Sequence, residues 1–355
     1  MNLLFLIHDM SHGAGTERVL STLANELAER GYSINIVSCQ NGLSSAFELH
    51  ENIHLDTLKG EQILNPILRK INNIKKLRDI CKQTKFDVII CVDVTLCLYL
   101  PFINVNHSKV IAWEHFSYDA VFGSKLQKIA RKFSASYCDA LVVLTKADLK
   151  CYMDNEKFIK NIVQINNPIN ITQNIKYKEE KKTVLAVGRL ENEKGFDLLL
   201  QSWKLVEDKY PEWRLKIVGE GSKRAELESL STNLKLLKVS LSGYTSNIEL
   251  EYENADIFVC SSRSEGFGMV LIEAQSYGIP VISFDCPVGP GEIIENGKNG
   301  ILVENGETQK LAEAIKELIE NTELRELLAK NAKYTVMQFN AKAVASEWEN
   351  LFKTL

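Results

Sequence analysis

The stretch DIFVCSSRSEGFGMVLIEAQSYGIPVISFD, residues 256–285, contains the pattern that decides the fold. It begins with an apolar run of strand length at 256–262, continues with an apolar helical segment over 268–277, and ends with a second apolar run at 280–285. Two buried strands joined by a helix are typical of a parallel crossover unit, whose helix covers one face of the sheet. The segment therefore predicts an α/β fold built on a parallel sheet.

Two acidic residues stand at the start of this helix. Glu265 lies in the Ser- and Gly-rich turn before it, and Glu273 lies about one and a half turns inside an otherwise apolar segment. Withdrawing a carboxylate from water costs several kcal/mol unless the group is paired or hydrogen-bonded. Glu273 therefore meets a buried Arg or Lys, lies on an exposed edge of the helix, or is satisfied by the hydroxyl groups of a ligand.

The same alternation of short apolar runs and helical stretches extends along the whole chain, and it predicts two Rossmann-like domains. A polar connector without periodicity, at 167–182, separates the halves, so we expect domains at 1–170 and 171–355. Beyond Gly306 the pattern is helical. Strands are predicted at 3–8, 33–38, 87–92, 109–114, 140–145 and 161–166, and then at 183–188, 214–219, 237–243, 256–262, 280–285 and 300–304.

Length and composition limit the class of protein. A chain of 355 residues with 45% hydrophobic content exceeds the usual size of one core, which favours two domains. The formal net charge of −4 argues against nucleic acid as the main partner. The eight cysteines form no Cys-x-x-Cys pair and read as reduced thiols of a cytoplasmic protein. We expect neither a signal peptide nor a membrane span.

A glycine-containing loop follows the first predicted strand. Gly13 and Gly15 let backbone N–H groups approach a ligand at the start of the next helix, although the loop could equally be a structural turn. The full Gly-x-Gly-x-x-Gly spacing is missing, and no acid ends the second strand to hold a ribose. These absences argue against a dinucleotide-dependent dehydrogenase.

In the second half, Arg189 and Lys194 follow the first strand. The planar fork of Arg and the point charge of Lys suit two neighbouring phosphoryl groups, but Glu191 and Glu193 could simply be their ion partners in a solvated loop. Glu265 and Glu273 follow the fourth strand, so all four side chains should lie at the carboxyl edge of one sheet, where ligands bind. Two cations for phosphates and two acids for hydroxyls together indicate a nucleotide sugar.

Several segments together resemble a known family. GRLENEKG followed by EGFGMVLIE, with GAGTERV, WEHF and DCPVGPGEIIENGKNGILV in the same order, resembles the family-4 retaining glycosyltransferases of the GT-B fold. They look most like its bacterial surface-polysaccharide members, of the O-antigen and capsule type. The resemblance implies two Rossmann-like domains with parallel sheets facing across a cleft. It also implies an acceptor-side first domain, a nucleotide-sugar-binding second domain, and a last helix, at about 340–355, that packs back on the first.

The resemblance also implies roles for individual residues. Glu273 would hold the ribose hydroxyls, Glu265 the donor sugar, and Arg189 with Lys194 the diphosphate. His115, in WEHF, would contact the transferred sugar, although a lone histidine is often only structural; His8 and His12 are weaker candidates. The predicted catalytic residues are His115, Glu265, Arg189 and Lys194, and the predicted donor-binding residues are Gly15, Arg189, Lys194, Glu265, Gly266, Phe267, Gly268, Met269, Val270 and Glu273.

The implied activity is transfer of a hexose or N-acetylhexosamine from a UDP-linked sugar with retention of configuration. No Asp-x-Asp occurs, so the positive charge at the departing diphosphate should come from Arg189, Lys194 and helix dipoles, and we expect no metal and no cofactor. The leaving phosphate would take the proton of the acceptor. The alternatives are a nucleotide-sugar epimerase with a similar site, and a nucleotide-sugar-binding protein that has lost catalysis.

Two basic segments suggest how an acceptor is reached. Residues 66–85 carry seven cations against one acid, and residues 124–133 carry four cations and no acid. Basic amphipathic helices are typical of membrane-surface elements, although an ordinary solvated helix face has the same composition. With the resemblance, they predict peripheral contact with the cytoplasmic face of the inner membrane and a polyprenyl-diphosphate-linked saccharide as acceptor.

Overall fold

The structure, a computed structural model, describes residues 1–40, 44–58, 65–103, 105, 107–118, 125–171 and 180–355. Much of the predicted connector at 167–182 lies outside these residues. Two compact units divide the chain: Met1–Asn170 together with Asn340–Leu355, and Ile171–Phe339. Each unit contains one parallel β-sheet with helices around it, so the predicted α/β fold class is confirmed.

The first unit has a seven-stranded sheet of order β3-β2-β1-β4-β5-β6-β7. Its central strands are nearly inaccessible to solvent because helices cover both faces of a parallel sheet. The strands are β1 (Asn2–Ile7), β2 (Ser33–Ser38), β3 (Ile53–Thr57), β4 (Val88–Val92), β5 (Lys109–Trp113), β6 (Ala140–Val143) and β7 (Ile162–Gln164).

Strand β3 is the element that the sequence pattern misses. Its residues, IHLDT, alternate between apolar and polar over only five positions, and the strand lies at the edge of the sheet. Such a segment contains no run of neighbouring apolar residues, and it is by runs of this kind that the other six strands are predicted.

The helices of the first unit include one from the far end of the chain. Helix α12 contacts α1, and Arg30 at the end of α1 donates hydrogen bonds to the carboxylate of Glu349 (2.7 Å) and the carbonyl of Lys342 (2.6 Å). Trp348 of α12 is fully buried. The helices are α1 (Gly15–Glu29), α2 (Pro66–Gln83), the 3-10 segment η2 (Val94–Phe102), α3 (Lys125–Tyr137), α4 (Lys146–Asn155) and α12 (Ala341–Thr354).

The second unit has a six-stranded parallel sheet of order β10-β9-β8-β11-β12-β13. Strands β8 and β11 are neighbours at its centre, which places the loops that follow them side by side. The strands are β8 (Thr183–Val187), β9 (Arg214–Val218), β10 (Val239–Leu241), β11 (Ile257–Cys260), β12 (Val281–Asp285) and β13 (Ile301–Glu304).

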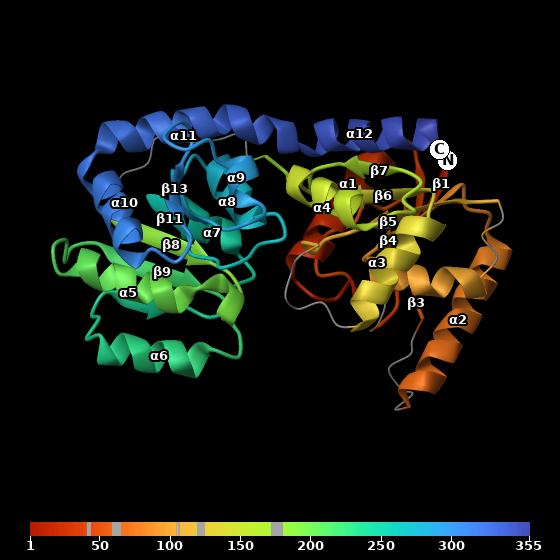
Figure 1. The fold of residues 1–355 in the computed structure, drawn as a ribbon, viewed down its shortest axis with the longest axis horizontal. Helices are drawn as coiled ribbons and strands as arrows, with labels where there is room; N and C mark the ends of the chain where they lie inside the picture. Colours follow the sequence, from red (N-terminus) through yellow and green to blue (C-terminus); the bar gives the residue numbers. More distant parts are fainter. Residues whose placement is uncertain (41–43, 59–64, 104, 106, 119–124, 172–179) are drawn as a thin grey trace. The chain divides into compact units, whose positions relative to one another are not determined.

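Helices surround the second sheet as the crossover pattern predicts. Helix α5 contacts α6 and α10, whereas α8 contacts α9 and α11 (Figure 1). They are the 3-10 turn η3 (Asn192–Lys194), α5 (Phe196–Glu207), α6 (Arg224–Asn233), α7 (Ile248–Glu253), α8 (Met269–Ser276), α9 (Pro290–Ile293), α10 (Thr308–Glu320), α11 (Thr322–Val336) and the 3-10 turn η4 (Met337–Phe339).

Helix α8 is the apolar helix of residues 256–285. It begins after Gly268, whose φ of +98° is a conformation that other residues rarely adopt. Leu271, Ile272 and Ala274 are fully buried, and Glu273 lies half-buried between them. The helix thus holds its acid at the margin of the core, close to the carboxyl edge of the sheet.

Candidate active site

In the second unit, the loops after β8 and β11 bring a lysine and a glutamate together. The ammonium of Lys194 donates a hydrogen bond to Oε1 of Glu265 at 2.7 Å, and the hydroxyl of Ser262 donates to the same oxygen at 2.5 Å. The side chains of Lys194 and Glu265 are only 18% and 8% exposed. Two residues separated by 71 positions thus form a buried ion pair at the sheet edge.

Further hydrogen bonds fix these two loops to each other. The Ser261 hydroxyl donates to the carbonyl of Lys194 at 3.0 Å. Arg263 donates to both carboxylate oxygens of Asp197, at 2.7 and 2.6 Å, and its backbone N–H donates to the carbonyl of Glu193. A bidentate Arg–carboxylate pair sets orientation as well as distance, so the loops form one rigid platform.

Gly195 is required for this close approach. Its φ is +62°, and a Cβ atom placed on it would lie 2.0 Å from the carbonyl oxygen of Ser261. Any side chain at this position would push the two loops apart.

Burial and charge act in opposite directions on Lys194. Burial lowers the pKa of its ammonium, but the carboxylate of Glu265 more than offsets this and holds the pKa above its ordinary value. The lysine is therefore a fixed positive charge at neutral pH.

Arg189 lies in the same β8 loop and remains open to solvent. Its side chain is 71% exposed, and it donates to Oε1 of Glu193 at 2.8 Å. Glu191, the other acid of the loop, instead accepts hydrogen bonds from the backbone and hydroxyl of Ser222. The local ion partner that the sequence allows for Arg189 is thus Glu193, and the guanidinium of Arg189 is exposed enough to contact another anion.

The carboxylate of Glu273 accepts a hydrogen bond from the hydroxyl of Tyr252 at 2.8 Å. Tyr252 stacks on Tyr277, with ring centroids 5.3 Å apart, so its hydroxyl is held in place. Sequence reasoning missed Tyr252 because it comes from another helix, α7, and the sequence pattern does not show which side chains of two helices meet.

The other predicted donor-binding residues of this unit line the entrance to α8. Gly266, Met269 and Val270 are half-buried. The side chain of Phe267 instead belongs to the core, 4% exposed and in edge contact with Phe339. Phe267 can therefore face a ligand only through its backbone.

In the first unit, His115 follows β5. Its ring lies 4.5 Å from that of Trp113, and its Nε2 atom is buried without a hydrogen-bond partner in the described part of the chain. Burial lowers the pKa of His115 to about 4. The imidazole is therefore neutral at physiological pH, with a buried polar atom left unsatisfied.

The residue before it, Glu114, anchors the same segment from inside. Its carboxylate accepts hydrogen bonds from Arg131 at 3.1 Å, from the hydroxyl of Tyr152 at 3.0 Å and from the backbone of Phe116 at 3.1 Å. Burial raises the pKa of Glu114 to about 7, although the Arg131 charge opposes this. The interior contacts hold the backbone on both sides of His115.

One of the four cations in the predicted basic helix at 124–133, Arg131, is buried. Only 4% of this residue is exposed, because its guanidinium pairs with Glu114 and donates to the carbonyls of Ser117 and Tyr118. The exposed face of α3 therefore carries Lys125, Lys128 and Lys132 without it.

Gly15 is the first residue of α1. It has no positive φ, and a Cβ atom there would meet nothing within 4 Å. Neither the backbone conformation nor the packing at this position requires a glycine. Gly15 lies in the first unit, whereas the other predicted donor-binding residues lie in the second.

A further cluster at the edge of the first sheet was not predicted. Asp93 follows β4 with a φ of +143°, which costs about 1–3 kcal/mol for a residue other than glycine. Its carboxylate accepts hydrogen bonds from the backbone and hydroxyl of Thr95, both at 2.6 Å, and lies 3.7 Å from Nε2 of His8. A polar residue directly after a buried central strand is the signal that could have drawn attention to Asp93.

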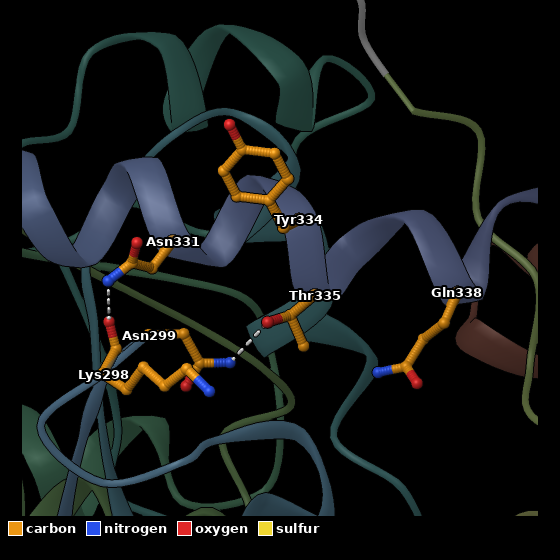
Figure 2. Close-up of a pocket in the computed structure, with 6 residues that line it drawn as sticks. All are labelled: Lys298, Asn299, Asn331, Tyr334, Thr335 and Gln338. Atoms are coloured by element: carbon orange, nitrogen blue, oxygen red, sulfur yellow. Dashed lines mark hydrogen bonds between the residues drawn. The ribbon is translucent and has the colours of Figure 1, made fainter.

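A hollow of about 360 Å³ lies elsewhere on the second unit, beside α11. Figure 2 shows Asn331 donating to the carbonyl of Lys298 at 2.8 Å and Asn299 donating to Thr335 at 2.9 Å across one side of it. None of the predicted site residues lines it, so it is separate from the Lys194–Glu265 platform.

The described residues contain neither a metal-binding cluster nor a membrane-spanning helix. No group of three or more His, Cys, Asp or Glu side chains there could hold a metal ion. Within the same residues, every helix is too short or too polar to cross a membrane.

Comparison with known families gives two matches that together cover most of the chain. Residues 169–335 match the family described as "Glycosyl transferases group 1". Residues 13–173 match "Glycosyltransferase Family 4".

Similar proteins of nearly equal length carry related descriptions. An uncharacterized glycosyltransferase of Haemophilus influenzae is 31% identical over 353 residues, covering 98% of both chains. The amylovoran biosynthesis glycosyltransferase AmsD of Erwinia amylovora is 28% identical, over 98% of this chain and 99% of its own. A Campylobacter jejuni N-acetyl-D-galactosaminyltransferase that acts on a diphospho-undecaprenol-linked saccharide is 27% identical, over 99% and 98%.

Solved structures share the fold. A mutant of S. aureus TarM, crystallised with fondaparinux, α-GlcNAc-glycerol and UDP, has a TM-score of 0.86 at 17% identity and 99% coverage of both chains. The lipopolysaccharide outer core galactosyltransferase WaaB has a TM-score of 0.77 at 23% identity and 100% coverage of both.

Proposed function

Because this chain belongs to the glycosyltransferases of group 1 and family 4, we propose that it transfers a hexose or N-acetylhexosamine from a UDP-sugar to a lipid-linked saccharide, with retention of configuration. The proposed pathway is the synthesis of a cell-surface polysaccharide. The descriptions of the relatives from E. amylovora and C. jejuni support this substrate class, and the UDP in the TarM complex supports the nucleotide.

The main support for a donor site in the second unit is the ion pair between Lys194 and Glu265. An ammonium has three donors, and Glu265 takes one of those of Lys194, which leaves two for the oxygens of a diphosphate. Arg189 adds an exposed guanidinium in the same loop. Glu265 is held against Lys194, so its second oxygen could accept a hydroxyl of the transferred sugar.

Glu273 suits the ribose of the donor. A ribose offers two adjacent hydroxyl donors, and a carboxylate accepts from both. The hydrogen bond from Tyr252 would hold the acid in position before the nucleotide arrives.

The proposed reaction follows from these charges. The acceptor oxygen bonds to the anomeric carbon on the face that the diphosphate leaves, the bond from the anomeric carbon to the phosphate oxygen breaks, and its electron pair departs with UDP. The acceptor proton passes to the leaving phosphate. Lys194 and Arg189 stabilise the negative charge that develops there, and because they are preorganised they need not reorient during the step. The neutral His115 would contact the transferred sugar.

Side-chain cations of this kind would make transfer independent of a divalent metal. We therefore expect activity to survive EDTA, measured as UDP release with and without added Mg²⁺ or Mn²⁺. A loss of activity that only a metal restores would contradict this part of the proposal.

The exposed residues of two helices support a membrane-bound acceptor. Leu68 and Ile71 of α2 are 56% and 57% exposed, and Leu126 and Ile129 of α3 are 45% and 59% exposed. Lysines are interspersed among them, which is the composition of helices that lie on anionic lipid. The proposed location is therefore the cytoplasmic face of the inner membrane.

The test is a matrix of donors and acceptors. UDP-GalNAc, UDP-GlcNAc, UDP-galactose and UDP-glucose are each incubated with undecaprenyl-diphosphate-linked oligosaccharides that end in GalNAc, GlcNAc or galactose. A lengthened lipid-linked product with an α-linkage, seen by mass spectrometry and NMR, supports the proposal. An isomerised donor would instead indicate an epimerase, and binding of UDP without turnover would indicate an inactive binding protein.

A further inference from the structure

Three side chains at the carboxyl edge of the first sheet form a connected group that the proposed mechanism does not use: His8, Asp93 and Thr95. Strands β1 and β4 are neighbours in register, with Leu6 opposite Cys91, so His8 after β1 lies beside Asp93 after β4. The His8 side chain is 46% exposed and that of Asp93 is 11% exposed. The group thus combines an accessible imidazole with a buried carboxylate.

The hydrogen bonds determine which nitrogen of His8 carries the proton. The Thr95 hydroxyl donates its one proton to Oδ1 of Asp93 at 2.6 Å, so towards His8 it can only accept. Its oxygen lies 3.1 Å from Nε2 of His8, which must therefore be the protonated nitrogen. Oδ2 of Asp93, 3.7 Å from the same nitrogen, favours a proton there as well.

The other nitrogen is then a hydrogen-bond acceptor. In a neutral imidazole with Nε2 protonated, Nδ1 carries a lone pair. Within the described residues, Nδ1 of His8 has no hydrogen-bond partner. In that tautomer the structure presents an accepting nitrogen, on a partly exposed ring, at the edge where ligands of parallel sheets bind.

The backbone strain at Asp93 supports a functional role for the group. Its φ of +143° is normally restricted to glycine, and strain of this kind concentrates where a side chain must be held in one place for function. Burial raises the pKa of Asp93, but hydrogen bonds from His8 and Thr95 outweigh it, so the pKa lies below its ordinary value. The carboxylate is therefore ionised at neutral pH and continues to fix the imidazole.

We infer that Nδ1 of His8 accepts a hydrogen bond from a hydroxyl of the acceptor saccharide, with Asp93 and Thr95 as positioning residues that hold the imidazole in the required tautomer. This inference rests on the proposed function, since it identifies the ligand as the acceptor of a sugar transfer. A hydroxyl fits because it can donate its proton to the lone pair of Nδ1. A phosphate does not, since both the lone pair and the nearby Asp93 carboxylate would repel it.

The first test measures the tautomer directly. Two-dimensional ¹H–¹⁵N NMR of the full chain labelled at histidine separates Nδ1–H from Nε2–H rings, and His8→Ala identifies the His8 signals. We expect the Nε2–H form in the wild-type protein. Asp93→Asn keeps the side-chain shape but replaces an acceptor by a donor, so the population of the Nε2–H form should fall. It should also fall in Thr95→Val, which lacks the hydroxyl. Thr95→Ser keeps the hydroxyl and should retain the Nε2–H form.

The second test is kinetic and uses whichever of the three undecaprenyl-linked saccharides named above is the best acceptor. Loss of one hydrogen bond predicts that His8→Ala, Asp93→Asn and Thr95→Val each raise the KM for this acceptor about tenfold. The KM for the UDP-sugar and the Kd for UDP should stay unchanged. His54→Ala is the matched control, because His54 forms an exposed pair with Asp56 at 3.0 Å in the same unit.

The outcomes separate this inference from the proposed function. If no saccharide of the matrix is lengthened by the wild-type protein, the proposed function fails, while the NMR measurement still decides the tautomer. A His8 ring that exchanges freely between tautomers, or a His8→Ala variant with an unchanged acceptor KM in an active enzyme, would overturn the inference.

Discussion

Glu114 and His115 are consecutive residues, and burial disfavours the charged form of both. It therefore raises the pKa of Glu114 and lowers the pKa of His115. The pKa of Glu114 is raised to about 7 and that of His115 is lowered to about 4, so both side chains are neutral between these values. Next to the charged Asp93, the segment after β5 thus adds no charge of its own at mildly acidic pH. A neutral His115 is suited to hydrogen bonding with a sugar hydroxyl.

These shifts predict opposite pH dependences of stability. Between pH 4.5 and 7 folded Glu114 keeps a proton that the unfolded chain has lost, so its contribution to the unfolding free energy falls as the pH rises. Between pH 4 and 6.5 the unfolded chain binds a proton that folded His115 does not, so the contribution of His115 rises. In the wild-type protein the two largely cancel between pH 4.5 and 6.5.

Single variants should reveal each contribution. We compare the unfolding free energy of each variant with that of the wild-type protein as the pH rises. For His115→Gln this difference should fall by up to about 1.4 kcal/mol per pH unit, and for Glu114→Gln it should rise by up to the same amount. Urea unfolding followed by ¹⁹F NMR of fluorotryptophan at Trp113 and Trp348 measures this in the first unit. His54→Gln, an exposed control, should show no such slope, and parallel curves for all three variants would contradict the burial of both charges.

The proposed phosphate contacts predict a kinetic effect. Lys194→Ala and Arg189→Ala should each slow transfer by roughly a hundredfold or more, because a preorganised charge at a developing anion is removed. Lys204→Ala is a suitable control, since this lysine pairs with Asp208 on the exposed side of α5. Near-normal turnover of both variants at saturating UDP-sugar would show that the diphosphate binds elsewhere.

At the scale of elements, the β8 and β11 loops depend on Gly195. Gly195→Ala should destabilise the second unit by at least about 2 kcal/mol, because it adds a clash to the cost of a positive φ. Gly306 has a similar φ of +87° but nothing within 4 Å of an added Cβ, so Gly306→Ala should cost only about 1 kcal/mol. Urea unfolding followed at Trp203 and Trp213 compares the two, and equal losses would mean that the close approach at Ser261 is unimportant.

The elements also show what the sequence can predict. Apolar runs of strand length predict twelve of the strands, and parallel topology alone predicts that Arg189, Lys194, Glu265 and Glu273 lie at one edge. Strand β3 lacks such a run. Contacts between the side chains of different elements, such as Tyr252 with Glu273 and Arg131 with Glu114, could not be predicted, because they depend on the orientation of whole helices.

At the scale of the whole molecule, aromatic contacts connect α12 to His115. Trp348 meets Trp113 edge-on with ring centroids 4.9 Å apart, and the centroid of the Trp113 ring lies 4.5 Å from that of His115. All three residues belong to the first unit. A change in α12 should therefore affect the histidine without touching the loops of the second unit.

Trp348→Ala tests this connection. Truncating a fully buried tryptophan should destabilise the first unit by about 3–5 kcal/mol and lower transfer, because Trp113 loses its support. Calorimetry should show that the Kd for UDP is unchanged in Trp348→Ala. Deletion of residues 340–355 should likewise leave the Kd for UDP unchanged. Lys353→Ala, an exposed change on the same helix, is the control. Weakened UDP binding in Trp348→Ala would place the effect outside the first unit.

The return of α12 to the first unit also constrains folding during synthesis. The apolar surface around Trp113 is completed only by a helix made after the whole second unit, about 170 residues later. At about 5–20 residues per second, the growing chain must carry that surface uncovered for roughly 10 to 30 s, long enough to need protection from aggregation. The unit translated second is therefore complete before the unit translated first.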